Sequence, residues 1–202
     1  MEQTLDERTI NPNPLAQFRQ WFDEAVNAKI LLPEAMTLAT ASPEGKPTAR
    51  VVLYKDVDEQ GFIFYTNYNS RKGKILSANP FGALVFYWEA LQRQIRIEGA
   101  LTKVSPGESD QYFATRPRDS QISALISSQS EVVTCRKELE RLAAEAVKRY
   151  EGKSIPRPAH WGGYRLKPAH IEFWQGREAR LHDRILYELQ RDGTWKISRL
   201  AP

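Results

Sequence analysis

The sequence predicts a mainly β protein with inserted helices, an α+β chain whose antiparallel sheet closes or nearly closes into a barrel. Short segments in which apolar and polar residues alternate recur between turn residues, which is the pattern of antiparallel strands. Many of the 5 Trp, 8 Tyr and 8 Phe, residue types that favour strands, lie in these segments. Closure would remove the exposed edges that so many short strands otherwise present.

Helices are expected at four places between the strands. Asn13 and Pro14 are typical of an N-cap and a first helical position, and apolar residues follow at helical spacing. Ser70 is a good N-cap for a short helix that ends near residue 78. Two short helices broken at Arg116-Pro117 are expected over 106–127, and a longer amphipathic helix over 132–150. The strands are expected at 35–41, 48–57, 62–66, 81–89, 92–104, 163–166, 171–175, 185–189 and 195–197.

Length and composition indicate the class of protein. The chain has 202 residues, of which 41% are hydrophobic and 27% charged, values typical of one folded domain. We therefore expect a single domain over 1–202, with a mobile polar arm at 1–12 and the last strands in 161–202. The net charge of +4 is too small to indicate a nucleic-acid partner. No apolar run is long enough for a membrane span and the N-terminus lacks a signal-peptide pattern, so a cytoplasmic protein is expected.

Two cationic segments accompany the early strands. Arg50 and Lys55 lie at opposite ends of a β-branched run, and strand alternation places them on opposite faces. Strand-end charges that reach solvent are the ordinary explanation. Further on, a strand ends after Tyr65 and a helix opens with Arg71 and Lys72. Free N–H groups at a helix start attract anions, so this is a candidate phosphate site, although a solvated helix start explains it equally well.

A second candidate phosphate site follows the break between two helices. Tyr112, Arg116 and Ser120 are spaced by four and share one face if helical geometry persists past Pro117. A guanidinium between two hydroxyls would cradle a phosphate, and Lys55 would complete the cradle. An ordinary polar helix surface is the alternative. The hydroxyl and amide cluster at 127–130 is explained equally well by capping of the next helix.

Aromatic rings, arginines and one histidine crowd into 172–184. His182 and Asp183 allow a Ser/His/Asp hydrolase to be considered, but neighbours in a strand point apart and the chain has no G-x-S-x-G elbow. Arg180 and His182, two apart in a strand, would project to one face and suit a planar anionic ligand. The single Cys135 and three scattered histidines predict neither an internal disulfide nor a metal site.

The motifs in these segments resemble those of the pyridoxine (pyridoxamine) 5′-phosphate oxidases, which are FMN enzymes. The similarity runs from about Pro14 to Pro202. It rests on RVVLYK (50–55), FYTN (64–67) with SRK (70–72), RPRDSQI (116–122), SSQS (127–130), FWQG (173–176), RLHDR (180–184) and WKISRLAP (195–202). The resemblance implies an antiparallel FMN-binding split β-barrel of Greek-key type.

The resemblance also assigns roles to the clusters. It implies that FMN is bound by Arg50, Val51, Val52, Leu53, Tyr54, Lys55, Tyr65, Thr66, Arg71, Lys72, Gln94, Gln129, Ser130, Trp174 and Arg184. It implies that the substrate phosphate is held by Lys55, Tyr112, Arg116 and Ser120. The resemblance places Arg180, Leu181 and His182 at the pyridine ring of the substrate. Arg180 would position this ring and polarise its reacting end, and His182 would assist Arg180 as the second catalytic residue.

The implied reaction is oxidation of pyridoxine or pyridoxamine 5′-phosphate to pyridoxal 5′-phosphate. A hydride would pass from the alcohol or amine carbon to flavin N5, and O2 would reoxidise the flavin and yield H2O2. The resemblance further implies a homodimer with FMN at the interface. Family members often carry a longer N-terminal arm with an Arg-Arg-Glu-Tyr-like segment that folds over the substrate, and residues 1–13 lack it.

Three other functions are compatible with parts of the sequence. A related branch of the same fold oxidises phenazine precursors with the same flavin. The chain is also compatible with a non-catalytic flavin- or haem-binding barrel. Nucleic-acid binding through the basic surplus has the weakest support, because the cations cluster in motifs that two phosphates explain better.

Overall fold

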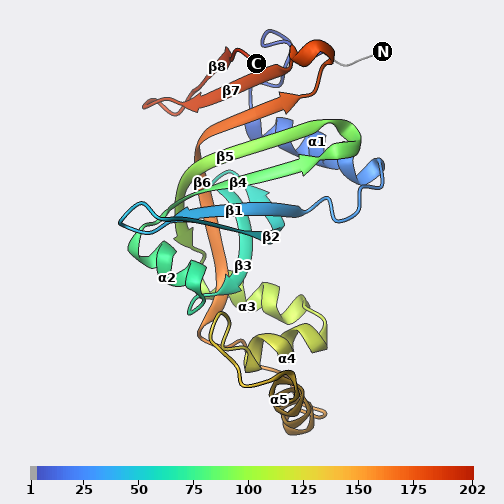
Figure 1. The fold of residues 1–202 in the computed structure, drawn as a ribbon, viewed down its shortest axis with the longest axis vertical. Coiled ribbons are helices and arrows are strands. Elements are labelled where there is room, and N and C mark those ends of the chain that lie inside the picture. Colours follow the sequence, from blue (N-terminus) through green and yellow to red (C-terminus); the bar gives the residue numbers. More distant parts are fainter. Residues whose placement is uncertain (1–3) are drawn as a thin grey trace.

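Eight antiparallel strands form one sheet, and six of them close into a barrel (Figure 1). The computed structural model describes residues 4–202. The pairing order is β3-β2-β1-β4-β5-β6, and β3 also pairs with β6, which closes the ring. The barrel strands are β1 (Ala35–Ala41), β2 (Pro47–Asp58), β3 (Gly61–Asn67), β4 (Phe81–Trp88), β5 (Arg93–Lys103) and β6 (Trp161–Gln175). Because β4 lies beside β1 after the hairpin-connected β1, β2 and β3, the topology is a Greek key, as expected.

The last strands extend the sheet beyond the barrel. The sequence predicts two strands within 161–175, and this is wrong, because β6 is one strand of 15 residues. Pro168 lacks an N–H for the ladder, but it lies where the register between β5 and β6 shifts, and such a bulge tolerates proline. At this crossing a Cβ on Gly99 would lie 2.0 Å from the carbonyl oxygen of Lys167, so the close approach requires glycine. The first half of β6 pairs with β3, and the second half pairs with β7 (Asp183–Leu189), which in turn pairs with β8 (Trp195–Arg199).

The first helix, α1 (Pro14–Asn27), packs its aromatic residues into the barrel core. The side chain of Asn13 accepts hydrogen bonds from the backbone N–H groups of Leu15 and Ala16, which confirms the predicted N-cap. The ring of Phe18 is fully buried and lies 4.8 Å from that of Phe62 and 5.1 Å from that of Phe86, measured between centroids. The core therefore fills the barrel and leaves binding sites to its outer surface.

Three helices form a smaller layer below the barrel in Figure 1. They are α3 (Pro106–Thr115), α4 (Arg118–Ile126) and α5 (Arg136–Arg149), and the predicted break at 116–117 separates the first two. This layer has its own core, which includes Phe113, Ile122 and Trp161. Helix α5 starts four residues later than predicted. Its apolar face is only partly covered, since Leu139 and Val147 are exposed. The remaining helix, α2 (Arg71–Ala78), begins after Ser70, whose side chain accepts a hydrogen bond from the N–H of Gly73, as predicted.

The N-terminal arm lies against the strands at the opposite end of the molecule. Residues 4–12 form no helix or strand, and residues 1–3 of the predicted arm fall outside the described residues. The backbone N–H of Leu5 donates to Asp183, and Glu7 forms an ion pair with Arg199 at 2.8 Å. The hydroxyl of Tyr187 donates to the carbonyl oxygen of Asn11 at 2.7 Å. The arm is thus in contact with β7 and β8, while its mobility stays a prediction. Within residues 4–202, no helix has the length and apolar character needed to cross a membrane.

Candidate active site

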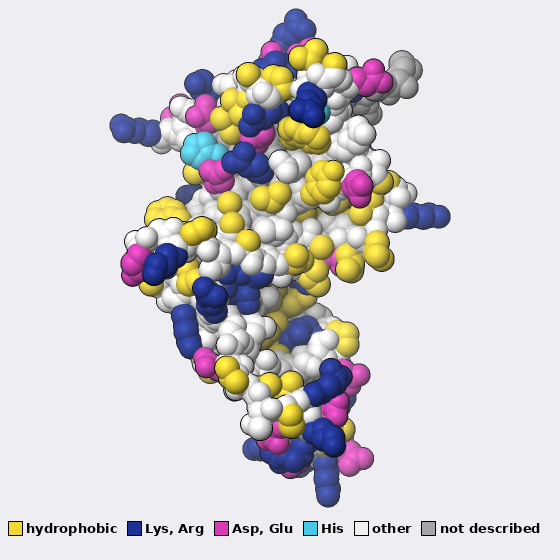
Figure 2. Space-filling view, viewed as in Figure 1, with side chains coloured by type: hydrophobic (Ala, Val, Ile, Leu, Met, Phe, Trp, Pro, Cys, Tyr) yellow, Lys and Arg dark blue, Asp and Glu magenta, His cyan; other side chains and the backbone are white. Residues whose placement is uncertain are grey.

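A pocket of about 510 Å³ opens between the outer surface of β2 and β3 and the helices α3 and α4. Figure 2 shows a hollow below the barrel with Lys and Arg side chains gathered at it. From the predicted cofactor set, the pocket is lined by Arg50, Val51, Val52, Leu53, Lys55, Tyr65, Thr66, Lys72 and Gln129. From the predicted substrate set, it is lined by Lys55, Tyr112, Arg116 and Ser120. Lys72 from the first candidate phosphate site and all four residues of the second therefore share one cavity.

One end of the pocket is built around Lys72. Its ammonium donates to the side-chain oxygens of Gln129 at 2.7 Å and Thr66 at 3.1 Å. Burial, together with the charge of Arg50, lowers the pKa of Lys72 to about 8. The predicted polar cluster at 127–130 thus contacts the pocket and does not cap the next helix, which begins after Cys135.

Arg50 lies at the same end and likewise has only neutral partners. Its guanidinium donates to the carbonyl oxygen of Leu38 at 3.1 Å and to the hydroxyls of Thr40 and Thr48. Desolvation, and then the charge of Arg71, lowers the pKa of Arg50. Neither Arg50 nor Lys72 forms an ion pair within residues 4–202. Cations without carboxylate partners in a concave site favour the binding of an anion.

The other end of the pocket is built around Arg116. Its Nη1 is buried and has no hydrogen-bond partner within residues 4–202. Burial lowers the pKa of this guanidinium. The ring of Tyr112 stacks on that of Tyr65 with centroids 3.9 Å apart, and burial raises the pKa of Tyr65 to about 12. A buried cationic donor that lacks an acceptor is the group that an incoming phosphate oxygen satisfies.

The local geometry corrects one expectation about how these residues meet and agrees with another. Arg116 and Pro117 are extended, so no helical face runs through Tyr112, Arg116 and Ser120, although all three line the pocket. Arg50 and Lys55 were expected on opposite faces of β2, and the alternating exposure of this strand agrees, since Arg50 is half-buried and Lys55 is exposed with Val51 and Leu53. Both nevertheless line the pocket, which runs along this stretch of β2.

Three members of the predicted cofactor set do not line this pocket, although each is next in sequence to a residue that does. The ring of Tyr54 packs in the core, with its centroid 5.2 Å from that of Phe18. Arg71 and Ser130 line an adjoining pocket of about 410 Å³. There the hydroxyl of Ser130 accepts a hydrogen bond from the backbone N–H of Arg71 at the start of α2.

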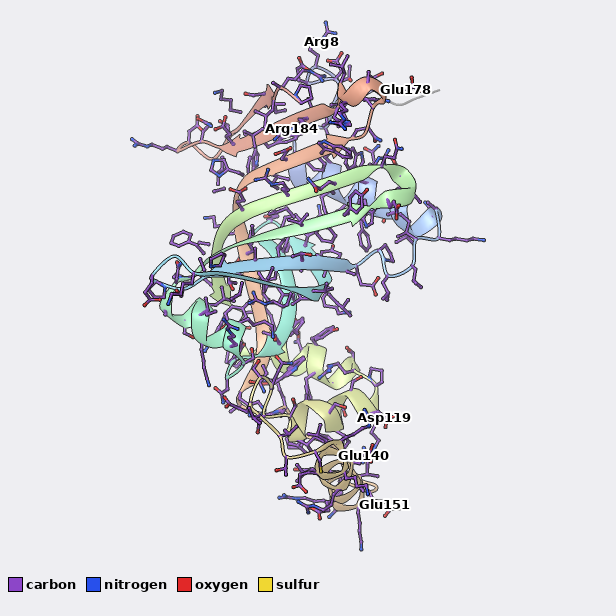
Figure 3. The ribbon with its side chains drawn as sticks, in the orientation of Figure 1. Arg8, Asp119, Glu140, Glu151, Glu178 and Arg184 are labelled. Atoms are coloured by element: carbon purple, nitrogen blue, oxygen red, sulfur yellow. The ribbon has the colours of Figure 1, made fainter. Side chains whose placement is uncertain are left out.

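The remaining predicted residues lie on the far part of the sheet. Gln94, Trp174 and Arg184 are paired across β5, β6 and β7 and so form one row. Figure 3 labels Arg184 near the end of the molecule opposite α5. Its guanidinium donates to both oxygens of the Glu172 carboxylate at 2.8 and 3.1 Å. Within one chain, this row does not reach the pocket lining.

The expected strand placement of Arg180 and His182 is wrong. Residues Glu178–Arg180 form a short 3-10 turn, and β7 begins only at Asp183. Ala179 (φ 52°) and Arg180 (φ 60°) are in the left-handed region, which breaks the strand. His182 is nevertheless held in place. Its Nδ1 accepts a hydrogen bond from the backbone N–H of Arg177 at 3.0 Å, and its ring lies 4.7 Å from that of Trp174.

Sequence reasoning missed Trp161, which is part of the pocket wall. Its indole is nearly parallel to the ring of Tyr65, at 5.4 Å between centroids and 11° between planes. Trp161 follows a proline-containing loop, and its partners come from β3 and α3. No local pattern links residues so far apart in sequence, so the cluster becomes visible only in the folded chain.

Residues 22–175 match the family model described as pyridoxamine 5'-phosphate oxidase. The chain belongs to the pyridoxamine 5'-phosphate oxidase family. Residues 161–202 match a second model, described as the pyridoxine 5'-phosphate oxidase C-terminal dimerisation region. Curated relatives named pyridoxine/pyridoxamine 5'-phosphate oxidase agree with this membership. Those of Nostoc punctiforme and Rubrobacter xylanophilus are 57% and 54% identical, over 98% of this chain and 92% and 91% of theirs. Membership identifies the chain as an oxidoreductase, the class that the sequence predicted.

Two solved structures show the same fold. PhzG from Burkholderia lata, in complex with tetrahydrophenazine-1-carboxylic acid, has a TM-score of 0.93 and 31% identity, and covers 99% of this chain and 98% of its own. A pyridoxamine 5'-phosphate oxidase-related, FMN binding protein from Nostoc punctiforme has a TM-score of 0.74 and 17% identity, and covers 92% of this chain and 97% of its own. The split-barrel fold of the pyridoxamine 5'-phosphate oxidase family is therefore that of this chain.

Proposed function

We propose that the chain oxidises pyridoxamine 5′-phosphate or pyridoxine 5′-phosphate to pyridoxal 5′-phosphate, with FMN as cofactor and O2 as electron acceptor. The observation that carries this proposal is the unsatisfied, buried Nη1 of Arg116 in a pocket that Lys55, Tyr112 and Ser120 also line. Two cations and two hydroxyls around one cavity are suited to a phosphate monoester. The names of the curated relatives support the same substrate class.

The other end of the pocket fits the phosphate of FMN. Arg50 and Lys72 have neutral hydrogen-bond partners, and Arg71 stands at the start of α2 beside them. A phosphate bound there would supply the missing counter-charge, and Thr66, Gln129 and Ser130 would add neutral hydrogen bonds. The family membership and the FMN-binding structural neighbour also support a flavin.

When bound, FMN supplies the hydride acceptor for the alcohol or amine carbon of the substrate and is reoxidised by O2 to give H2O2. The chain's own residues position the substrate. Lys55, Tyr112, Arg116 and Ser120 would fix its phosphate, and Arg180 would position the ring and polarise its reacting end. Because Nδ1 of His182 accepts the N–H of Arg177, a neutral His182 carries its proton on Nε2 and can donate it toward the substrate.

We infer that a homodimer completes the site, because one chain separates the two groups of predicted residues. Gln94, Trp174, Arg180 and His182 would then come from a second copy. Exposed apolar side chains mark a face on which two copies can pack, among them Val51 (66% exposed) and Tyr87 (59% exposed). The match of 161–202 to a dimerisation region supports this arrangement.

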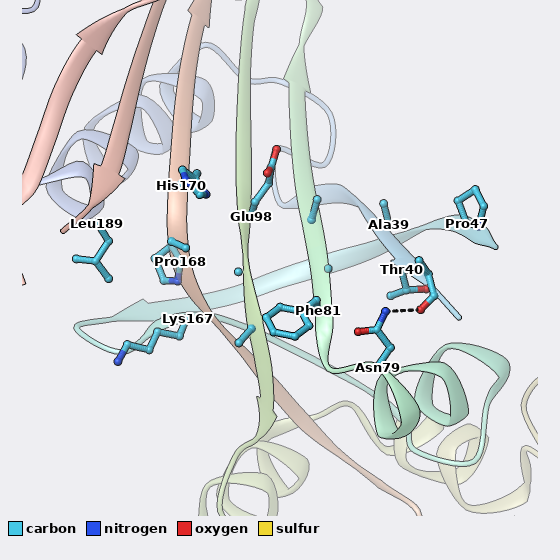
Figure 4. A pocket seen from close by; sticks show the side chains of 16 residues that line it. Ala39, Thr40, Pro47, Asn79, Phe81, Glu98, Lys167, Pro168, His170 and Leu189 are labelled. Carbon is cyan, nitrogen blue, oxygen red and sulfur yellow. Dashed lines mark hydrogen bonds between the residues drawn. The ribbon is translucent and has the colours of Figure 1, made fainter. Parts of the chain in front are cut away.

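A groove of about 700 Å³ on the outer surface of the sheet adds to this apolar face (Figure 4). Its wall includes Phe81, which is 61% exposed, together with Pro168 and Leu189. The amide of Asn79 donates to the carbonyl oxygen of Ala41 and so closes one end of the groove. Burial of this apolar surface against a second copy would stabilise a dimer.

The visible spectrum tests the proposed reaction directly. The purified protein should be yellow, and pyridoxamine 5′-phosphate added without oxygen should bleach its flavin absorption. The anaerobic step should yield one pyridoxal 5′-phosphate and one ammonia for each flavin reduced. Readmission of O2, after excess substrate has been removed, should restore the colour and release one H2O2 for each flavin. A flavin that stays oxidised with this substrate would contradict the proposal and favour a non-catalytic flavin-binding barrel.

Oxidation of a phenazine precursor is the second candidate function. The similarity to PhzG over nearly the whole chain favours it. The two candidates differ in the anion that Arg116 and Lys55 would bind, a phosphate in one and a carboxylate in the other. Peroxide formation with pyridoxamine 5′-phosphate, measured beside tetrahydrophenazine-1-carboxylic acid at the same concentration and corrected for the rate without enzyme, separates them.

A further inference from the structure

We propose that Trp161 is a positioning residue for the substrate phosphate, because its indole face holds the guanidinium of Arg116 at the wall of the pocket that Lys55, Tyr112 and Ser120 also line. The inference rests on the proposed function, in which Arg116 binds that phosphate. It adds a residue that the sequence motifs do not mark. Trp161 would act through Arg116 and not by contact with the reacting atoms.

The indole of Trp161 is fixed within a stack of aromatic rings. Trp161 is only 6% exposed and is the first residue of β6, paired with Asn67 at the end of β3. Its ring is nearly parallel to that of Tyr112, with 5° between planes and 6.3 Å between centroids. The ring of Phe113 meets it edge-on at 5.2 Å. Aromatic contacts on several sides leave the indole little freedom to rotate.

Arg116 lies on the indole in a conformation that favours a bound anion. Its guanidinium carbon is 4.5 Å from the ring centroid of Trp161 and 5.7 Å from that of Phe113. Stacking uses the flat face of the guanidinium, so its N–H donors stay available at the edge for bidentate contact with phosphate. Nη1 is the donor without a partner within residues 4–202. The interaction of a cation with an aromatic face strengthens as water is excluded, and this site is buried.

A second arginine, Arg157, links the backbone of Trp161 to the helix that precedes Arg116. Nη1 of Arg157 donates to the carbonyl oxygen of Trp161 at 2.6 Å. Nε of the same side chain donates to Asp110 on α3, also at 2.6 Å. Arg116 follows directly after the end of α3. The backbone positions of Trp161 and Arg116 are therefore linked through α3 before any ligand binds, and such preorganisation lowers the entropic cost of binding.

The test compares Trp161→Leu and Trp161→Phe with the wild-type holoenzyme on two substrates, pyridoxamine 5′-phosphate and pyridoxamine. The ratio of kcat/KM for the first to that for the second measures the use of the phosphate. We expect this ratio to fall about tenfold in the Leu variant and about threefold in the Phe variant, which keeps a weaker aromatic face. The FMN content and the kcat at saturation with the phosphorylated substrate should stay within about twofold of wild type. Trp195→Leu, on β8 and away from the pocket lining, is the matched control and should leave the ratio unchanged.

Equal losses on the two substrates, or an unchanged ratio in Trp161→Leu, would overturn the inference. The Phe variant guards against misfolding of the Leu variant, since a fall in its ratio with a normal melting temperature supports the role by itself. If the wild type does not oxidise pyridoxamine 5′-phosphate, the proposed function fails. The inference is then decided by calorimetric titration of the flavin-loaded protein with inorganic phosphate. Weaker binding by Trp161→Leu than by wild type would support it, and equal or undetectable binding by both would refute it.

Discussion

The pocket beside β2 and β3 differs from the far sheet, formed by β6 and β7, in the hydrogen-bond and ion-pair partners of its arginines. In the pocket, Arg50 bonds to neutral oxygens and Arg116 leaves one buried nitrogen without a partner within residues 4–202. On the far sheet, Arg184 is paired with Glu172, and Asp183 is paired with both Arg177 and Arg199. The contrast shows where the chain keeps positive charge available and where it uses that charge to fix structure.

This difference has an energetic basis. A buried cation without a counter-ion lowers the stability of the folded chain, so it is kept where a ligand later supplies the negative charge. On the far sheet, the arginines compensate the charge of the buried carboxylates Glu172 and Asp183, and removal of one partner would leave a buried charge without compensation. We therefore expect substitutions in the pocket to change binding, and substitutions in the paired network to change stability.

The largest expected effect is on substrate binding by Arg116. Arg116→Ala would remove the proposed charge-assisted contact with the phosphate, so the KM for pyridoxamine 5′-phosphate should rise about a hundredfold. The affinity for FMN should change little. Arg118→Ala is the matched control, because Arg118 is exposed on α4 and donates only to backbone carbonyls of residues 150 and 153. A similar rise in KM for both variants would show that the pocket does not select the phosphate through Arg116.

Mixing two impaired variants, assayed at a pyridoxamine 5′-phosphate concentration far below the raised KM of Arg116→Ala, tests whether the two regions serve one site. Arg116→Ala damages the pocket, and Trp174→Ala damages the far sheet. In a mixed dimer, one site would carry both substitutions and the other would carry neither. Equal amounts of the two variants, unfolded and refolded together, should therefore regain about a quarter of wild-type activity by random pairing. Activity no higher than that of the separate variants would mean that each chain builds its site alone.

A pH effect of intermediate size is expected from Lys72. Because its pKa is lowered to about 8, its charge is lost as the pH rises through that value. FMN binding should weaken about tenfold from about pH 7 to about pH 9, whereas riboflavin, which has no phosphate, should bind equally at both. Lys72→Arg stays charged and should remove the dependence. The stability of the flavin-free protein should depend on pH in the opposite direction. Between pH 8 and 10.5 the folded chain binds fewer protons than the unfolded chain, so the free energy of unfolding rises with pH.

The sequence predicted the barrel strands and most pocket-lining residues, but not the strand irregularities or the contacts between distant segments. Strand alternation and local caps such as Asn13 and Ser70 depend on neighbouring residues, so their elements formed where expected. The register shift in β2 after Tyr54 and the continuation of β6 through Pro168 depend on partner strands. The cluster of Trp161, Tyr65 and Arg116 joins three distant segments and has no local signal.

The smallest effect is expected in the network around Asp183. Burial raises its pKa, but hydrogen bonds from Arg177 and Arg199 outweigh this, so the pKa is lowered below 3.8. The pairing therefore stabilises the fold above about pH 4 and is lost as the pH falls further. Asp183→Asn should lower the melting temperature by about 2–8 °C at neutral pH, and the difference should shrink in acid.

Glu140→Gln is the matched control for this network. Glu140 forms a solvent-exposed ion pair with Arg136 on α5, and such pairs contribute little to stability. Its loss should leave the melting temperature unchanged. If Asp183→Asn behaves in the same way, the contacts of the N-terminal arm and Arg199 with Asp183 do not stabilise the far sheet.

The continuity of β6 gives the proposed dimer a fixed internal spacing. Trp161 at its first position faces the pocket of its own chain, and Trp174, near its last, belongs to the row that would complete the other pocket. A strand of this length reaches at most about 50 Å. The length of β6 would then fix the distance between the two active sites of the dimer. An insertion or deletion near Pro168 would therefore change the position of Trp161 or Trp174 in both active sites.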